Sequence, residues 1–290
     1  MPQHVLLTGA AGGIGGAIAE EFAAQGAFLT LADRDPEALE RTAARLDTRA
    51  ATRAADLTGP DAPGALVEAA WAAHGPVDIL VNAAGVYPSL DMADVDAASW
   101  DRLFAVNLRA PVLATAAFAR LATGAGRGGA VVNISSGSAL RARPGGGPYA
   151  ASKAALEMAT RAAALELGAH GIRVNAVSPG FVPVASDCNP VSAEYAAAIG
   201  ANPLGRPGTP RDIARAVRWI AGPDASWVTG EILRVDGGSS TGALHLPRIW
   251  PQDRPRPASA GTTPAAPAPA GTAPPAPTPA APAATEGQTR

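Results

Sequence analysis

The residue pair best suited to chemistry in this 290-residue chain is Tyr149 and Lys153, which stand four positions apart. In a helix, side chains at this spacing share one face. A free phenol has a pKa near ~10, too high for a base at neutral pH, but a nearby ammonium favours the phenolate and lowers that pKa. Tyr149 could then act as a general acid and base. Taken alone, the spacing also fits a surface pair on a helix.

The composition sets Lys153 apart from the other cations. Of the 23 lysine and arginine residues in the chain, it is the only lysine. An ammonium is a compact group with three donors, whereas a guanidinium is a planar fork, so the two do not replace one another. The single ammonium beside Tyr149 therefore favours the chemical role.

A glycine-rich turn near the N-terminus is the second candidate site. Residues 8–15 read TGAAGGIG, with an apolar run before them and a helical pattern beginning among them. Glycine lets the backbone approach a pyrophosphate, and the free N–H groups of a helix N-terminus bind it. Gly9, Gly13, Ile14 and Gly15 are therefore candidate cofactor-binding residues. The spacing differs from G-x-G-x-x-G, and an ordinary strand–helix turn is the alternative.

An acidic residue indicates which cofactor the turn would hold. Asp33 ends the second apolar run, 20 residues after Gly13. A carboxylate at this place accepts hydrogen bonds from the adenosine ribose and repels a 2′-phosphate, which favours NAD over NADP. Arg34 follows directly and could instead hold a phosphate.

The elements that must position these residues alternate between strands and helices. This alternation predicts βαβ units, and hence an α/β fold with a parallel sheet covered by helices on both faces. The expected strands are His4–Thr8, Ala27–Ala32, Ile79–Asn82, Ala130–Ser135, Ile172–Val177 and Ile232–Val235, with a weaker one at Ala51–Ala55. The expected helices are Ile14–Gln25, Pro36–Leu46, Ala62–Ala73, Trp100–Leu121, Tyr149–Gly168 and Pro210–Ala221.

The chain divides by composition into a domain, residues 1–245, and a tail, residues 246–290. From residue 251 onward the sequence is rich in proline and alanine and has no aromatic residue. Such a segment buries too little apolar area to offset its ordering entropy, so we expect a disordered spacer. A docking arm for a partner is the alternative.

Composition also excludes several classes of function. A net charge of −2 speaks against binding of nucleic acid through bulk charge. Cys188 is the single cysteine and the four histidines are scattered, so we expect no disulfide framework and no metal site. No long apolar stretch suits a membrane span, and no basic region precedes the first apolar run. We therefore expect a soluble, cytoplasmic protein.

Several motifs follow one another in a fixed order along the chain. They are residues 8–15, Asp56-Leu57, residues 82–85 (NAAG), Asn107, Ser136, Tyr149-x-x-x-Lys153 and Pro179-Gly180. With these motifs, residues 3–240 resemble the short-chain dehydrogenase/reductase family. The resemblance implies a single-domain Rossmann fold with a doubly wound parallel sheet of about seven strands. It also implies hydride transfer between a nicotinamide cofactor and a secondary alcohol or ketone carbon.

The resemblance assigns catalytic roles to four residues. It makes Tyr149 the general acid and base, while Ser136 orients the reacting oxygen of the substrate. Lys153 lowers the pKa of Tyr149 and binds the nicotinamide ribose. Asn107 holds a water that links Lys153 to solvent. By residue type alone, Ser135 and Ser138 compete with Ser136.

Further residues are assigned to the cofactor by the same resemblance. Asp56, at the end of the third strand, contacts the adenine amino group. Asn82 supports the sheet beside the cofactor, and Val182 contributes backbone groups. The remaining assigned residues are Leu57, Gly85, Pro179 and Gly180. The chain departs from the family pattern at Ala83, Ala139 and Val184, and Ser186 could compensate for Val184.

The substrate side is less specified. Residues 186–203 form the expected lid, in which Cys188 is taken as structural rather than nucleophilic. Tyr87 and Leu90 could line the pocket. Arg141 and Arg143 could bind an anionic substrate, or could be solvated loop charges. The helices Trp100–Leu121 and Tyr149–Gly168 would pack in a homodimer or homotetramer, as the resemblance implies.

Three other functions stay open beside an NAD-dependent dehydrogenase acting on a small alcohol or ketone. One is an NADP-linked ketoreductase acting on 3-oxoacyl substrates, against which Asp33 speaks. Another is a non-catalytic nucleotide-binding scaffold, against which the set of Asn107, Ser136, Tyr149 and Lys153 speaks. The third places the function in the tail, as an interaction segment.

Overall fold

The computed structural model describes residues 2–184, 192–244 and 246–247. Seven parallel strands form one sheet in the order β3-β2-β1-β4-β5-β6-β7. This confirms the predicted α/β Rossmann fold with its doubly wound sheet. The strands are β1 (His4–Thr8), β2 (Phe28–Asp33), β3 (Ala50–Ala54), β4 (Ile79–Asn82), β5 (Gly129–Ile134), β6 (Ile172–Pro179) and β7 (Ile232–Val235).

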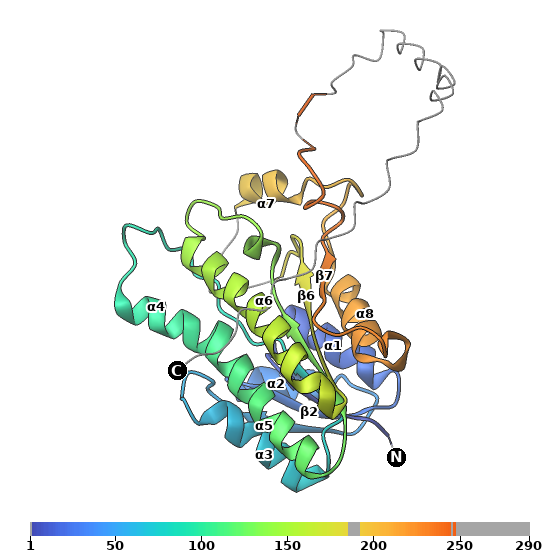
Figure 1. Cartoon of the computed structure of the whole chain (residues 1–290). Helices are drawn as coiled ribbons and strands as arrows, with labels where there is room; N and C mark the ends of the chain where they lie inside the picture. Colours follow the sequence, from blue (N-terminus) through green and yellow to red (C-terminus); the bar gives the residue numbers. More distant parts are fainter. Residues whose placement is uncertain (1, 185–191, 245, 248–290) are drawn as a thin grey trace, which may run out of the picture. The chain divides into compact units, whose positions relative to one another are not determined.

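Helices cover both faces of the sheet (Figure 1). The α-helices are α1 (Gly13–Ala23), α2 (Pro36–Ala43), α3 (Ala62–His74), α4 (Ala97–Phe104), α5 (Ala110–Gly124), α6 (Gly147–Leu167), α7 (Ala193–Gly200) and α8 (Pro210–Ala221). Shorter turns are the π-helical η1 (Ala105–Arg109) and the 3-10 turns η2 (Gly137–Ala139), η3 (Gly168–His170) and η4 (Pro223–Ala225).

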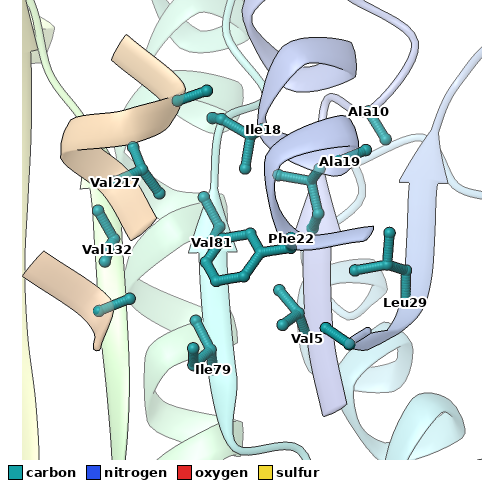
Figure 2. Packing of buried hydrophobic residues seen from close by; sticks show 14 of the residues in the cluster. Val5, Ala10, Ile18, Ala19, Phe22, Leu29, Ile79, Val81, Val132 and Val217 are labelled. Atoms are coloured by element: carbon teal, nitrogen blue, oxygen red, sulfur yellow. The ribbon is translucent and has the colours of Figure 1, made fainter. Parts of the chain in front are cut away.

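Two apolar layers hold the sheet between the helices. Successive residues of a strand point to opposite faces, so Val5 and Leu7 enter one layer and Leu6 the other. The first layer is closed by α1, α2 and α8, and Figure 2 shows Phe22 of α1 reaching across the strands beside Val81. The second layer is closed by α3, α5 and α6. The inner strands β1, β4, β5 and β6 are buried on both faces, which explains their mainly apolar sequences, whereas the edge strands β3 and β7 are partly exposed.

The strand order reverses at β1, whose neighbours are β2 and β4. The helices after β1 and β4 therefore lie on opposite faces of the sheet, which leaves a crevice at the carboxyl ends of these strands. Ligands of open α/β sheets bind at such a switch point. The glycine turn follows β1 directly, so the topology places it at this crevice.

Capping residues decide where two helices begin. α8 begins at Pro210 as predicted, because Thr209 Oγ accepts from Asp212 N at 3.2 Å and the Asp212 carboxylate accepts from Thr209 N at 2.8 Å. α4 begins at Ala97, earlier than expected, because the Asp96 carboxylate accepts from Ser99 N at 2.7 Å.

The prediction of one continuous helix over Trp100–Leu121 is wrong. The π-helical turn η1 separates α4 from α5 and contains Asn107 at its centre. Pro111 has no N–H group, so it cannot bond the carbonyl of Asn107 four residues back, and the regular helical ladder is interrupted there. The asparagine is thus presented from a widened turn.

Two other expectations need correction or lie outside the structure. β3 ends at Ala54, so Asp56 stands in the following loop rather than closing the strand. Helix α7 was not predicted as an element and lies in the second half of the expected lid. Ser186, Cys188 and residues 248–290 lie outside the described residues, so the domain division at residue 245 stays a prediction.

Burial of His4 makes the stability of the fold depend on pH. His4 is only 4% exposed, with Nε2 2.9 Å from Thr30 Oγ1, and its burial lowers its pKa from the ordinary value. The unfolded chain therefore binds more protons than the folded chain as the pH falls through about 6.5. We expect the melting temperature to fall in this window, because protonation of His4 stabilises the unfolded chain while the buried ring of the folded chain stays neutral.

Thermal unfolding of the wild type and the His4→Gln variant between neutral and mildly acidic pH tests this expectation. On acidification, the melting temperature of the variant should fall by fewer degrees than that of the wild type. His170→Gln is the matched control, since His170 is exposed on η3 and should keep the wild-type slope. Identical slopes for His4→Gln and the wild type would contradict the role of His4.

Candidate active site

The glycine turn after β1 is shaped by two close backbone approaches. Gly9 has φ +69°, and a Cβ there would lie 2.6 Å from Ala84 N. A Cβ at Gly15 would collide with the carbonyl oxygen of Gly9. Only glycine fits both places, so these two residues set the shape of the turn. Thr8 joins the turn to the segment after β4, since its Oγ1 accepts from Ala83 N at 3.1 Å and from Ala84 N at 3.2 Å.

The N-terminus of α1 is free to bind an anion. Its N-cap, Gly12, makes no side-chain hydrogen bond, and no acidic residue stands in the first turn. Among the described residues, the first N–H groups of this helix therefore lack a side-chain partner, and the helix dipole adds a partial positive charge. The turn fits a pyrophosphate by its donors and by the space that its glycines leave.

Asp33 lies against this turn, as the sequence predicted. It ends β2, and its carboxylate accepts from Ala11 N at 3.1 Å and from Asp35 N at 3.3 Å. Arg34 is exposed. The carboxylate thus reaches the backbone of the glycine turn, whereas Arg34 lies on the surface beside it.

Tyr149, Lys153 and Ser136 come together in the wall of one cavity of about 960 Å³. Tyr149 and Lys153 stand near the start of α6, and Ser136 follows β5. Lys153 is 4% exposed, its Nζ donates to Ile134 O at 2.8 Å, and it lies 5.9 Å from the centre of the Tyr149 ring. The structure therefore brings a phenol, an ammonium and a hydroxyl into one site.

Asn107 lies behind this site rather than in the cavity wall. It is fully buried, and its Oδ1 accepts from Val86 N at 2.8 Å while its Nδ2 donates to Val86 O at 2.8 Å and to Ser152 Oγ at 3.2 Å. A Cβ at Gly85 would lie 3.5 Å from Asn107 Oδ1 and 3.6 Å from Lys153 Nζ. The amide thus ties the segment after β4 to α6, and its role with a water stays a prediction.

Burial dominates the electrostatics of the pair. It lowers the pKa of Lys153 to about 8 and raises the pKa of Tyr149 above its ordinary value. The Ser136 hydroxyl and the Arg143 guanidinium lower the pKa of Tyr149, but less than burial raises it. In the protein by itself, burial therefore outweighs the groups that lower the pKa of Tyr149, and Lys153 Nζ donates to Ile134 O. The lowered pKa that we expect from the ammonium stays a prediction.

The hydrogen bonds distinguish Ser136 from its two rivals. Ser135 Oγ donates to Glu157 Oε1 at 2.8 Å, and Ser138 Oγ accepts from Arg143 Nη2 at 3.1 Å. Ser136 Oγ accepts from Ser138 N at 3.1 Å, and its side chain also forms the hydrogen bond that lowers the pKa of Tyr149. Of the three serines, Ser136 is thus the one that lies beside the phenol.

The residues assigned to the cofactor divide into two groups. Ile14, Gly85, Pro179, Gly180 and Val182 line the cavity, and so does Val184. Val184 also lies against the glycine turn, since a Cβ at Gly13 would lie 2.8 Å from its Cγ1. The structure therefore places apolar contacts where the family pattern has a threonine.

The second group is absent from the described part of the cavity wall, and it comprises Gly9, Gly13, Gly15, Asp33, Asn82, Asp56 and Leu57. Asn82 is buried and its Nδ2 donates to Asn133 Oδ1 at 2.9 Å, which supports the sheet as expected. Asp56 is exposed, and its carboxylate accepts from Thr58 N at 3.0 Å, which lowers its pKa. Leu57 packs against the apolar layer under α3 and α5. Their contacts with a cofactor stay predictions.

The substrate side of the cavity is formed by three segments. Tyr87 lines it, with its ring centre 6.2 Å from that of Tyr149, whereas Leu90 does not. The loop after β5 contributes Arg143, and α7 contributes Tyr195 and Ile199. Arg141 is directed elsewhere, because its Nη2 donates to Ser239 O at 2.8 Å.

Sequence reasoning missed Glu157 and the residues of α7. Glu157 is buried one helical turn after Lys153, where it accepts from Ser135. The helical spacing of Tyr149, Lys153 and Glu157 could have identified it as part of the same face. The α7 residues had no comparable signal, because their contact with the site is made only in the folded chain.

The described ranges contain no group of three or more His, Cys, Asp or Glu residues able to hold a metal ion. Among the same residues, every helix is too short or too polar to cross a membrane.

Comparison with known proteins identifies the relatives of this chain. Residues 9–240 match the family model described as Enoyl-(Acyl carrier protein) reductase. Galactitol 2-dehydrogenase (L-tagatose-forming) of Cereibacter sphaeroides is 41% identical over 239 residues, which cover 80% of this chain and 92% of that enzyme.

Solved structures similar to this chain include oxidoreductases of one family. One described as a short chain dehydrogenase/reductase family protein has a TM-score of 0.71 and 38% identity, over 83% of this chain and 98% of the other. A blue fluorescent protein from a metagenomic library, solved in complex with NADPH, has a TM-score of 0.72 and 36% identity, over 82% of this chain and 98% of the other. With its sheet, its glycine turn and its Tyr149–Lys153 pair, the chain belongs to the short-chain dehydrogenase/reductase family of oxidoreductases.

Proposed function

We propose that this protein is an NAD-dependent dehydrogenase that transfers a hydride between nicotinamide and the carbon of a secondary alcohol or ketone. The observation that carries the proposal is the grouping of Tyr149, Ser136 and Lys153 in the wall of one cavity, next to an uncapped helix N-terminus. The relation to a galactitol 2-dehydrogenase supports a secondary alcohol as the reacting group.

Each residue of the site has a separate role in the proposed reaction. When bound, the nicotinamide ring accepts or supplies the hydride at its C4. Tyr149 removes the hydroxyl proton in oxidation and returns it in reduction, and Ser136 donates a hydrogen bond to the reacting oxygen. Lys153 holds the nicotinamide ribose and, as a cation, favours the phenolate form of Tyr149 over the phenol. Asn107 keeps the segment after β4 against α6, so that Gly85 and Lys153 stay close.

The test is a screen of secondary alcohols with NAD and NADP, and of ketones with NADH and NADPH, followed by the absorbance of the reduced nicotinamide. We expect turnover of at least one alcohol–ketone pair, with a higher kcat/KM for NAD than for NADP. A protein that binds the cofactor but turns over no member of the screen would favour the non-catalytic scaffold.

An NADP-linked ketoreductase acting on 3-oxoacyl substrates is the second candidate. The related structure in complex with NADPH is the observation that favours it. The position of the Asp33 carboxylate against Ala11 N speaks for NAD, because a 2′-phosphate would stand close to a second negative charge. Assembly as a homodimer or homotetramer and a cytoplasmic location stay predictions beside this function.

Replacement of Asp33 by alanine should change the cofactor preference. Removing the carboxylate relieves its repulsion of the 2′-phosphate and removes an acceptor for the ribose hydroxyls, so the ratio of kcat/KM for NADP to that for NAD should rise by about tenfold or more. Asp56→Ala is the control, since Asp56 is an exposed carboxylate that should affect both cofactors alike. A wild type that already prefers NADP would contradict the argument from Asp33.

A further inference from the structure

The charged side chains that line the described part of the cavity wall are all positive. Among the described residues that line it, the charged ones are Lys153 and Arg143, and both are cations. Lys153 is buried against Ile134 O beside Tyr149. Arg143 stands in the loop between η2 and α6, on the side where α7 closes the cavity. The wall on the substrate side therefore carries a positive charge.

The partners of Arg143 in the described structure are neutral. Its Nη1 donates to Tyr195 Oη at 3.0 Å and its Nη2 donates to Ser138 Oγ at 3.1 Å. None of the ion pairs between the described residues involves Arg143. A guanidinium has five N–H donors and is always charged, so two hydroxyl partners leave both donors and charge available. A carboxylate or a phosphate would balance the charge of the guanidinium and would accept two parallel hydrogen bonds from its N–H groups.

The guanidinium lies within reach of the reacting groups. It donates to Ser138, whose N–H donates to Ser136 Oγ, so one short chain of hydrogen bonds joins it to the hydroxyl that would face the substrate oxygen. Its charge also favours the phenolate of Tyr149, which requires the two side chains to be close. A substrate whose reacting carbon lies at Ser136 and Tyr149 would thus extend toward Arg143.

The neighbouring arginine shows that this placement is specific. Arg141 stands two residues earlier in the same loop, but it donates to Ser239 O and is absent from the cavity wall as described. Of the two arginines that the sequence offered for an anion, the fold directs only Arg143 into the cavity.

We propose that the substrate is a secondary alcohol or ketone that carries a carboxylate or a phosphate, and that Arg143 binds this anionic group. The proposal rests on the proposed dehydrogenase function and adds the chemical class of its substrate. Arg143 would hold the end of the substrate remote from the reacting carbon, and Ser138 and Tyr195 would orient the guanidinium.

The experiment compares related substrates with and without an anionic group. 3-Hydroxybutyrate is measured against its methyl ester, and glycerol 1-phosphate against glycerol, so that the two pairs distinguish a carboxylate from a phosphate. For the wild type we expect a higher kcat/KM for the anion of at least one pair. Because a hydrogen bond to a charged group is worth roughly a factor of ten to a hundred, Arg143→Met should lower the anion-to-neutral ratio by that factor, mainly through KM.

Two further variants make the result specific. Arg141→Met is the matched control and should leave the ratio unchanged. Arg143→Lys keeps the charge but loses the fork, so its ratio should fall between those of the wild type and Arg143→Met. Calorimetric titration of the same anions into the complex with NADH measures their binding without turnover, and the melting temperatures show whether each variant is folded.

The outcomes separate this proposal from the function on which it rests. Turnover of neutral partners with no preference for an anion would overturn the role of Arg143 and leave the dehydrogenase function standing. A preference for the anion that Arg143→Met leaves unchanged would overturn it as well. Turnover of no alcohol or ketone in the wider screen would contradict the proposed function itself, and this inference with it.

Discussion

Replacing Tyr149 by phenylalanine is expected to lower kcat for alcohol oxidation by about a hundredfold or more. The substitution removes one hydroxyl in the cavity wall and keeps the ring that packs against Tyr87. A positioned acid or base contributes about 10²–10⁴ to a rate, and the described residues that line the cavity include no His, Asp or Glu that could replace the phenol. Binding of NADH should change little, because the phenylalanine ring fills the same place.

Initial rates and NADH fluorescence titration measure the two effects separately. The wild-type rate of oxidation should rise with pH, since the phenolate is the base and burial raises the pKa of Tyr149. The residual rate of the variant should lack this dependence. Tyr87→Phe also removes a hydroxyl from the wall and should cause a much smaller loss. If kcat were unchanged in Tyr149→Phe, Tyr149 would not be the acid and base.

Gly15→Ala is expected to be the most damaging change in the glycine turn. The new Cβ would collide with the carbonyl oxygen of Gly9, which is backbone and cannot rotate away. Gly15 is buried at the start of α1, so the collision must shift the turn or the helix. Overpacking of this kind costs about 1–3 kcal/mol or more, and the shifted turn would also lose its shape for a pyrophosphate.

Gly16→Ala provides a control one residue away. Gly16 is also buried in α1, but a Cβ there would find its nearest neighbour, Ala10 O, at 3.8 Å. Alanine favours a helix over glycine by about 1 kcal/mol, so this variant should be as stable as the wild type or more stable. Urea unfolding and NADH titration of both variants test the pair. Equal stability and affinity in Gly15→Ala and the wild type would refute the close approach.

Much of the fold could be predicted because its signals are local. The bounds of β1, β4, β7 and α8 agree with the predicted ones, since apolar runs, helical spacing and the residues around Thr209 act within a few positions. The grouping of Tyr149 with Lys153 was predictable for the same reason, because one helical turn joins them. Asp33 could be assigned to the glycine turn because it ends the strand that pairs with β1.

Other features depend on contacts between distant residues. The π-helical turn at Asn107 needs both Pro111 and the bonds of the amide to Val86 and Ser152. Helix α7 meets the site through Tyr195 and Arg143, which are far apart in the sequence. Sequence patterns do not specify such pairings, because they arise only when the chain has packed.

The strand and helix order, the glycine turn, and the residue types that can move a proton all follow from local sequence patterns. Packing in three dimensions sets which of two nearby arginines faces the cavity, which serine lies beside Tyr149, and the direction in which the pKa of Tyr149 shifts. The physical reason is that propensity and spacing act along the chain, whereas burial, desolvation and the direction of a long side chain depend on every segment packed around it.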